Sequence, residues 1–232
     1  MGDHIVTAFD EDLIELRARI SEMGGLAEQL FSLSLDSVEK RDETLAQEVI
    51  AKDKRLDALE FEVERLATQL IARRQPMAQD LRATISAMKL STTLERVGDL
   101  AKNIAKRGIA LSGSDPLHIS GSVVRMGRQA QKHLTEVLDA YVKGDVDAAI
   151  AVWRRDVEID EAYNSMFREV VTYMMEDPRT ISLASQLLFI AKNVERIGDH
   201  TTHVAEMIYY VAKGEPLGDD RPKGEPLDLG RQ

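Results

Sequence analysis

Carboxylates one helical turn apart are the residues of this sequence best suited to chemistry. The pentapeptide Glu-Arg-Val/Ile-Gly-Asp occurs at residues 95–99 and again at residues 195–199, an offset of 100. Because residues four apart lie on one face of a helix, each copy presents two carboxylates to the same side. Like charges at this spacing repel by roughly a few tenths of a kcal/mol, so a bound cation would stabilise the pair.

A second acidic pair precedes each pentapeptide. Asp53 and Asp57 have the same four-residue spacing, and Asp156 and Asp160 repeat it at an offset of 103. The two surrounding segments align without a gap. If the paired helices of each half are neighbours, four carboxylates converge on one groove, and we interpret this pattern as a metal-binding site.

The acidic row continues for one more turn with Asn103 in the first copy and His203 in the second. Oxygen ligands with an occasional imidazole suit Mg, Ca, Mn, Fe or Zn, and His203 favours a transition metal among these. Two other interpretations remain open. Charged rows are also typical of the solvated face of an amphipathic helix, and Arg96 and Arg196 are placed to neutralise the acids as ordinary ion pairs.

The sequence predicts no catalytic function. A di-iron carboxylate bundle needs Glu-x-x-His on two helices, and no Glu of this sequence is followed by His three residues later. There is no His-based zinc-protease motif and no Gly-rich phosphate loop, and no Ser-His-Asp set can be picked out. A metallo-hydrolase that uses the carboxylates is the weakest hypothesis, because no general acid–base pair accompanies them.

Helices must position these carboxylates, and the sequence predicts six of them between about residue 8 and residue 213. Apolar residues recur at three- and four-residue steps, and clusters of Gly, Pro, Asp and Ser interrupt the pattern five times. Each helix would be about 25 to 35 residues long, which is typical of elongated bundles. The breaks lie near residues 40–44, 73–80, 112–122, 143–148 and 176–182.

The repeated motifs divide the chain into two halves. We therefore expect an all-α fold of two tandem, pseudo-symmetric three-helix bundles, at residues 8–111 and 117–213. Residues 214–232 are charged, contain three prolines and are expected to form a disordered tail. Gly98 and Gly198 stand inside helices, which indicates close helix–helix packing. The stripes expected to face the core are Leu90, Leu94, Val97, Ala101 and Ile104 in the first half, and Ile190, Val194, Ile197, Val204 and Ile208 in the second.

Composition argues against several classes of protein. The net charge of −10 is unlike a nucleic-acid-binding surface, which is normally basic. The sequence has no cysteine, which excludes disulfides and thiolate metal sites and is consistent with a cytoplasmic protein. No run of about 18 apolar residues is long enough to cross a bilayer. The N-terminal sequence lacks the basic and apolar regions of a signal peptide.

With these motifs assembled, the chain resembles the PhoU family of phosphate-uptake regulatory proteins over about residues 5–213. The resemblance rests on "FDEDLIELRARISEMGGLAE", "VIAKDKRLDALE", "LERVGDLAKNI" and "VERIGDHTTHV". It implies two similar three-helix bundles with multinuclear metal clusters on their surface, of iron or zinc, with Mg or Mn as alternatives. The matching ligand positions are Asp53, Asp57, Glu95, Asp99 and Asn103 in the first copy, and Asp156, Asp160, Glu195, Asp199 and His203 in the second.

The same resemblance implies a regulatory function rather than a catalytic one. Proteins of this family act at the cytoplasmic face of the membrane, between a phosphate ABC transporter ATPase and a sensor histidine kinase, and repress phosphate-starvation signalling when phosphate is plentiful. We expect the chain to be peripheral to the membrane through these partners, and a homodimer stays open. The alternative from another class is a helical scaffold without a metal-dependent function.

The two copies differ in a way that bears on their sites. Glu60 and Glu64 follow the first acidic pair, whereas Tyr163 and Phe167 stand at the corresponding positions of the second. The second site is therefore expected to carry less negative charge. His203 in place of Asn103 adds to the difference, so the two sites are expected to differ in affinity or metal number.

Overall fold

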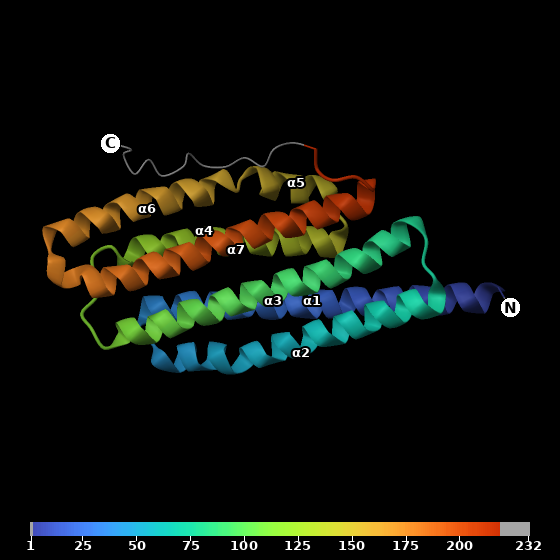
Figure 1. Cartoon of the computed structure of the whole chain (residues 1–232), viewed down its shortest axis with the longest axis horizontal. Coiled ribbons are helices and arrows are strands. Elements are labelled where there is room, and N and C mark those ends of the chain that lie inside the picture. Colours follow the sequence, from blue (N-terminus) through green and yellow to red (C-terminus); the bar gives the residue numbers. More distant parts are fainter. Residues whose placement is uncertain (1, 219–232) are drawn as a thin grey trace.

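The structure is a computed structural model that describes residues 2–218 of the chain, with side chains from residue 11 onward. Within that part of the chain every regular element is helical, as Figure 1 shows. The first three helices are α1 (Gly2–Lys40), α2 (Glu43–Arg74) and α3 (Ala78–Ser112). They are followed by α4 (Ser120–Lys143), α5 (Val146–Arg154), α6 (Val157–Glu176), the 3-10 turn η1 (Pro178–Thr180) and α7 (Ile181–Lys213).

The helix ends follow ordinary capping chemistry, which is why the five predicted breaks are correct. Asp42 caps α2 by accepting hydrogen bonds from two backbone N–H groups of the first turn, and Asp145 caps α5 with one. Gln75 and Gly144 end α2 and α4 in the left-handed conformation, with φ of 49° and 65°. Asp177 accepts a hydrogen bond from a backbone N–H of η1.

The observed helices differ from the expected ones at two places. The first helix begins at Gly2 rather than near residue 8. The fifth long helix is interrupted, because Arg155 N–H bonds the carbonyl of Val152 at 3.0 Å and closes α5 with a tight turn before α6 begins. Of the predicted disordered tail, residues 219–232 lie outside the described residues.

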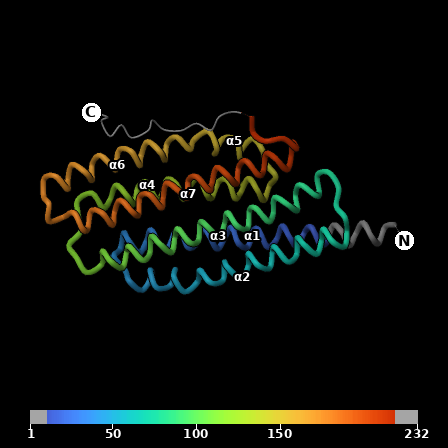
Figure 2. Tube along the Cα trace, viewed as in Figure 1, coloured from blue at the N-terminus to red at the C-terminus, as the bar shows by residue number. Residues whose placement is uncertain are grey.

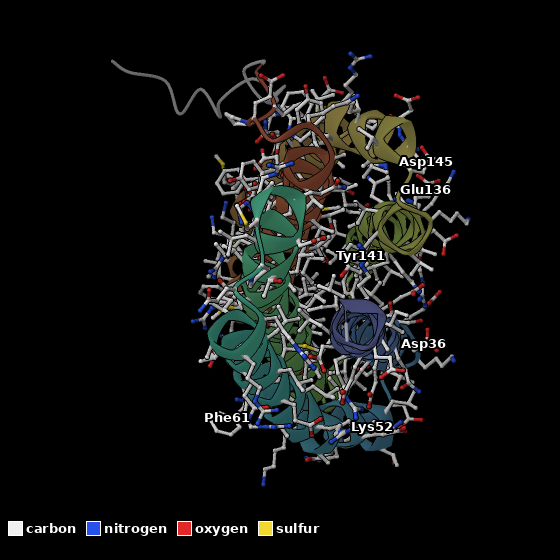
Figure 3. The ribbon with its side chains drawn as sticks, turned by 90° about the vertical axis from the view of Figure 1, so that its right-hand side faces the viewer. Asp36, Lys52, Phe61, Glu136, Tyr141 and Asp145 are labelled. Carbon is white, nitrogen blue, oxygen red and sulfur yellow. The ribbon has the colours of Figure 1, made fainter. Side chains whose placement is uncertain are left out.

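The helices form two three-helix bundles that lie side by side in an elongated molecule. The first comprises α1, α2 and α3, and the second comprises α4, the α5–α6 pair and α7 (Figures 1 and 2). Across the boundary α3 packs against α7 and α1 packs against α4. Figure 3, which views the molecule end-on, shows the two bundles stacked, with Tyr141 of α4 between them.

The predicted core stripes are confirmed. All ten residues of the two stripes on α3 and α7 are buried, from 0% exposed at Val97 and Ile197 to 6% at Ile208. They belong to one apolar cluster that continues from the first bundle into the second. No helix of residues 2–218 has both the length and the apolar content that a membrane span requires.

Candidate functional site

Each bundle places a buried aspartate against the glycine of its Glu-Arg-x-Gly-Asp motif. Asp53 of α2 is only 3% exposed, and Asp156 at the start of α6 is 2% exposed. A Cβ atom built on Gly98 would lie 3.4 Å from Asp53 Oδ1, and one built on Gly198 would lie 3.5 Å from Asp156 Oδ1. The two halves therefore share one register, and the pairing of helices expected from the repeat is confirmed.

A lysine outside the set of predicted ligands bridges the first acidic cluster. Lys102 Nζ donates to Asp53 Oδ2 at 2.5 Å and to Asp99 Oδ1 at 2.6 Å, so it joins α2 to α3. Burial opposes the charge of the ammonium, but the hydrogen bonds to both carboxylates outweigh it and raise the pKa of Lys102. The ammonium group of Lys102 therefore lies between the carboxylates of Asp53 and Asp99.

Glu95 completes the first cluster from the same helix. Its burial, followed by the negative charges of Asp99 and Glu60, raises the pKa of Glu95 to about 7. Burial acts in the same direction on Asp99, but the hydrogen bond from Lys102 prevails and lowers the pKa of that carboxyl. Arg96 lies 3.5 Å from both Glu95 and Asp99 and supplies further positive charge, as the ion-pair interpretation expected.

Two of the predicted ligands of the first copy stand apart from this cluster. Asp57 on α2 and Asn103 on α3 are both exposed. Among the described residues, no hydrogen bond or ion pair joins either of them to Asp53 or Asp99. The structure thus brings together Asp53 and Asp99 through Lys102, with Glu95 beside them.

The second acidic cluster lies on the corresponding helices, α6 and α7, and differs at the position of the bridging lysine. Thr202 occupies the position that corresponds to Lys102; it is 2% exposed and its hydroxyl donates to the carbonyl of Asp199 at 2.8 Å. Burial raises the pKa of Glu195, and the charges of Asp199 and Asp160 act in the same direction. The carboxylates of Asp199 and Asp160 therefore disfavour the charged form of Glu195.

Lys192 compensates part of this charge from one turn earlier. Its Nζ atom lies 2.7 Å from Glu195 Oε2 and acts against the rise in the glutamate's pKa. About half of the Lys192 side chain, 51%, is exposed, and its ammonium also lies over the Tyr163 ring, 5.2 Å from the centroid. Lys192 is thus a half-exposed partner of Glu195, whereas Lys102 is a more buried bridge between two carboxylates.

His203, the predicted imidazole ligand, faces the other bundle. His203 Nδ1 lies 3.3 Å from Glu206 Oε2, and the other oxygen of Glu206 accepts a hydrogen bond from Trp153 Nε1 at 3.1 Å. Together with Asp199, His203 borders a cleft of about 370 Å³ between α3 and α7. The residues lining this cleft are Thr92, Thr93, Arg96, Asp199, His200, Thr202, His203 and Glu206.

Both clusters contain carboxylates, which are common metal ligands, but the side chains of the two clusters are arranged differently. Within the described residues, no three His, Cys, Asp or Glu side chains converge tightly enough to hold one ion. In the first cluster Lys102 lies between the carboxylates, so a metal ion bound there would have to displace its ammonium. In the second cluster the donor set fits a cation chemically, and its side chains would have to close around the ion.

Sequence reasoning missed Lys102, Lys192 and the bundle-to-bundle cleft. Lys102 follows Asp99 by three residues and Lys192 precedes Glu195 by three, so an i, i+3 charge pair was the available signal. His200 gave no such signal. It lies in the cleft, and its burial lowers its pKa.

Comparison with known proteins identifies the family. Residues 20–108 and 123–208 each match the family model described as the PhoU domain. The chain belongs to the PhoU family. The first matched segment lies within α1 to α3 and the second within α4 to α7, so one PhoU domain corresponds to each bundle.

Relatives of known description are similar over nearly their whole length. A Caulobacter vibrioides protein named "Phosphate-specific transport system accessory protein PhoU homolog" is 50% identical over 98% of this chain and 99% of its own. The Escherichia coli PhoU, named as the accessory protein of the same system, is 34% identical over 96% and 94%. The crystal structure of PhoU from Pseudomonas aeruginosa superposes with a TM-score of 0.87 at 36% identity, over 89% of this chain and 100% of that one.

Proposed function

We propose that this chain is a regulatory accessory protein of a phosphate-specific transport system, which modulates phosphate uptake and represses phosphate-starvation signalling. The observation that carries the proposal is the near full-length similarity to the Caulobacter relative, at 50% identity over 98% of the chain. Relatives with this description are named as accessory proteins and not as enzymes. The role proposed here is accordingly one of binding and signalling.

In this role the protein acts in the cytoplasm as an adaptor between two membrane-associated partners. One is the ATPase of the phosphate ABC transporter and the other is a sensor histidine kinase, and both would be bound through the long helical surfaces of the two bundles. The protein would reach the membrane through these partners, and a homodimer is compatible with the role. Negative net charge makes a nucleic-acid partner unsuitable.

The adaptor also binds metal, iron or zinc in multinuclear form or alternatively Mg or Mn, at the acidic grooves. A bound ion would supply the positive charge that offsets the repulsion between carboxylates of adjacent helices. Burial and neighbouring carboxylates raise the pKa of Glu195 in the second groove. A bound cation would stabilise the charged form of this carboxylate, which supports the proposed metal binding. The ligand positions proposed are Asp53, Asp57, Glu95, Asp99, Asn103, Asp156, Asp160, Glu195, Asp199 and His203.

Co-purification tests whether the protein binds the two proposed partners. Tagged protein should retain both the transporter ATPase and the histidine kinase from cells grown with ample phosphate, and deletion of its gene should switch on a phosphate-starvation reporter under the same conditions. Recovery of neither partner, together with a silent reporter, would contradict the adaptor.

Elemental analysis of protein purified without a His-tag tests the proposed metal binding. The wild type should carry iron or zinc, and an Asp99→Ala/Asp199→Ala variant should carry far less. Glu15→Gln, which changes an exposed carboxylate of α1 outside the acidic motifs, is the matched control. Equal and negligible metal in all three proteins would contradict the proposed metal binding.

A second candidate is a helical scaffold whose acids are neutralised by its own basic residues. The Lys102 bridge between Asp53 and Asp99 favours this reading for the first groove. A scaffold of this kind predicts the same melting temperature with EDTA and with added metal. A site that binds the folded state must instead raise the melting temperature when metal is added.

A further inference from the structure

We propose that a cavity between the two bundles binds a small anionic amphiphile, a molecule with one apolar chain and one negatively charged head, such as a medium-chain carboxylate. The cavity has a volume of about 450 Å³, within the range of about 300–1,000 Å³ that is usual for small-molecule sites. It lies where α3 begins and where α4 and α7 end. No predicted metal ligand lines it, so the inference is independent of the proposed metal binding.

Both bundles contribute apolar walls to this cavity. Leu16 of α1 and Leu90 of α3 line it from the first bundle, and Ile208 of α7 lines it from the second. These three side chains belong to the buried core, whereas Val142 of α4, which also lines the cavity, is 67% exposed. An apolar chain bound here would remove the surface of Val142 and of the cavity walls from water, which favours binding.

The charge of the lining residues favours an anion. The whole chain carries 40 acidic residues and a net charge of −10. Among the described residues that line this cavity, however, none is acidic and two are basic, Arg17 of α1 and Lys143 of α4. Lys143 is paired with Asp139, at 3.3 Å from Nζ to Oδ2, whereas no ion pair joins Arg17 to another residue with a described side chain. The guanidinium of Arg17 is therefore the group that we assign to the charged head, and its planar fork suits a carboxylate.

Two hydroxyl groups of the cavity favour a ligand that accepts hydrogen bonds over a purely apolar one. Ser86 of α3 is 1% exposed, and its Oγ atom has no hydrogen-bond partner in the described part of the chain. Tyr141 of α4 lies between the bundles in Figure 3. Burial raises the pKa of Tyr141 to about 12, and the nearby charge of Arg17 opposes that shift. The phenol thus stays protonated at neutral pH and can donate to a head held by Arg17, and a partner for the buried hydroxyl of Ser86 would remove a cost to stability.

Calorimetric titration of the full-length protein with sodium decanoate, kept below the concentration at which it forms micelles, tests the inference. We expect saturable binding of a single decanoate per chain, with a rise in melting temperature because the ligand binds the folded state. Arg17→Gln should weaken binding by about tenfold, since it removes a charge-assisted contact. Arg65→Gln removes the same charge from an exposed position of α2 and should bind as the wild type does. Decanol, which has the same chain without the charge, should bind about tenfold more weakly than decanoate.

A second variant tests the cavity itself. Ala83 lines the cavity and is partly exposed, so Ala83→Phe should fill the space and abolish decanoate binding while circular dichroism shows unchanged helix content. Arg17 is exposed, so Arg17→Gln remains a valid test if the larger side chain disturbs the fold.

Three results would overturn the inference. The first is the absence of saturable decanoate binding by the wild type, and the second is equal binding by the wild type and Arg17→Gln. The third is a wild-type dimer that Ala83→Phe turns into a monomer, because a second copy of the chain would then cover the cavity.

Discussion

Gly98 of α3 lies directly against Leu56 of α2, so closely that a Cβ atom on the glycine would overlap the leucine side chain. Leu56 is fully buried, at 0% exposed. In the second bundle a Cβ on Gly198 would meet Ile159 Cγ2 at 3.3 Å, a tight but less severe contact. The absence of a side chain at the motif glycine is therefore required more strictly in the first bundle than in the second.

The first prediction follows from this difference. Gly98→Ala should lower the free energy of unfolding by about 1 kcal/mol, because overpacking costs typically 1–3 kcal/mol and the helix gains about 1 from alanine. Gly198→Ala should be near neutral, because the gain in helix propensity offsets a milder clash. Urea denaturation of both variants measures this, and a larger loss for Gly198→Ala would contradict the packing described.

The second prediction concerns the pH dependence that Glu95 causes in the metal-free protein. Its pKa in the folded protein is raised to about 7 from 4.5, so the folded state holds the proton more tightly than the unfolded chain. The stability that this proton contributes is fully present below pH 4.5 and is lost as pH rises through 7.

Glu95→Gln should therefore gain stability relative to the wild type between pH 5 and pH 8, by several degrees in melting temperature, since about 1 kcal/mol corresponds to roughly 2–4 °C for a chain of this size. The measurement is thermal unfolding in EDTA, with Glu64→Gln as control. A constant difference between Glu95→Gln and the wild type at all pH values would contradict the shift.

The third prediction concerns His133, a buried residue of α4 that is 3% exposed. Burial lowers its pKa, Arg155 acts in the same direction and Lys132 adds to it, whereas Glu158 and Glu136 oppose the shift. The folded state thus favours neutral imidazole. The stability it contributes is present above the unfolded pKa of about 6.5 and is lost as pH falls through the lower folded value.

His133→Gln should accordingly lose less stability than the wild type when the pH is lowered from 7.5 to 5.5. The comparison of melting temperatures over this interval isolates the histidine, because the other titrating groups are common to both proteins. A steeper decline in the variant than in the wild type would show that His133 is protonated in the folded state.

The fold could be predicted well from sequence because its signals are local. Capping residues such as Asp42 and Asp145 and the left-handed Gly144 mark helix ends within a few residues of the chain. The apolar stripes repeat with helical period, so their burial followed directly. The break between α5 and α6 could not be predicted, because neither Gly nor Pro stands at Arg155 or Asp156.

The candidate site could be predicted only in part, because its chemistry depends on distances between helices. The sequence placed Asp53 opposite the motif through the register of the repeat, and the structure confirms this. It showed Lys102 only as a neighbour of Asp99 on one helix. The reach of Lys102 to Asp53 depends on how closely α2 and α3 pack, and the direction of His203 toward α3 depends on how the two bundles meet.

The central proposal is that the acidic grooves of this protein bind metal. Anomalous scattering at the zinc edge, from crystals soaked in zinc chloride, tests it most directly. We expect one peak between α2 and α3 beside Asp53 and Asp99, and one between α6 and α7 beside Glu195 and Asp199. The absence of a peak from both grooves would contradict it.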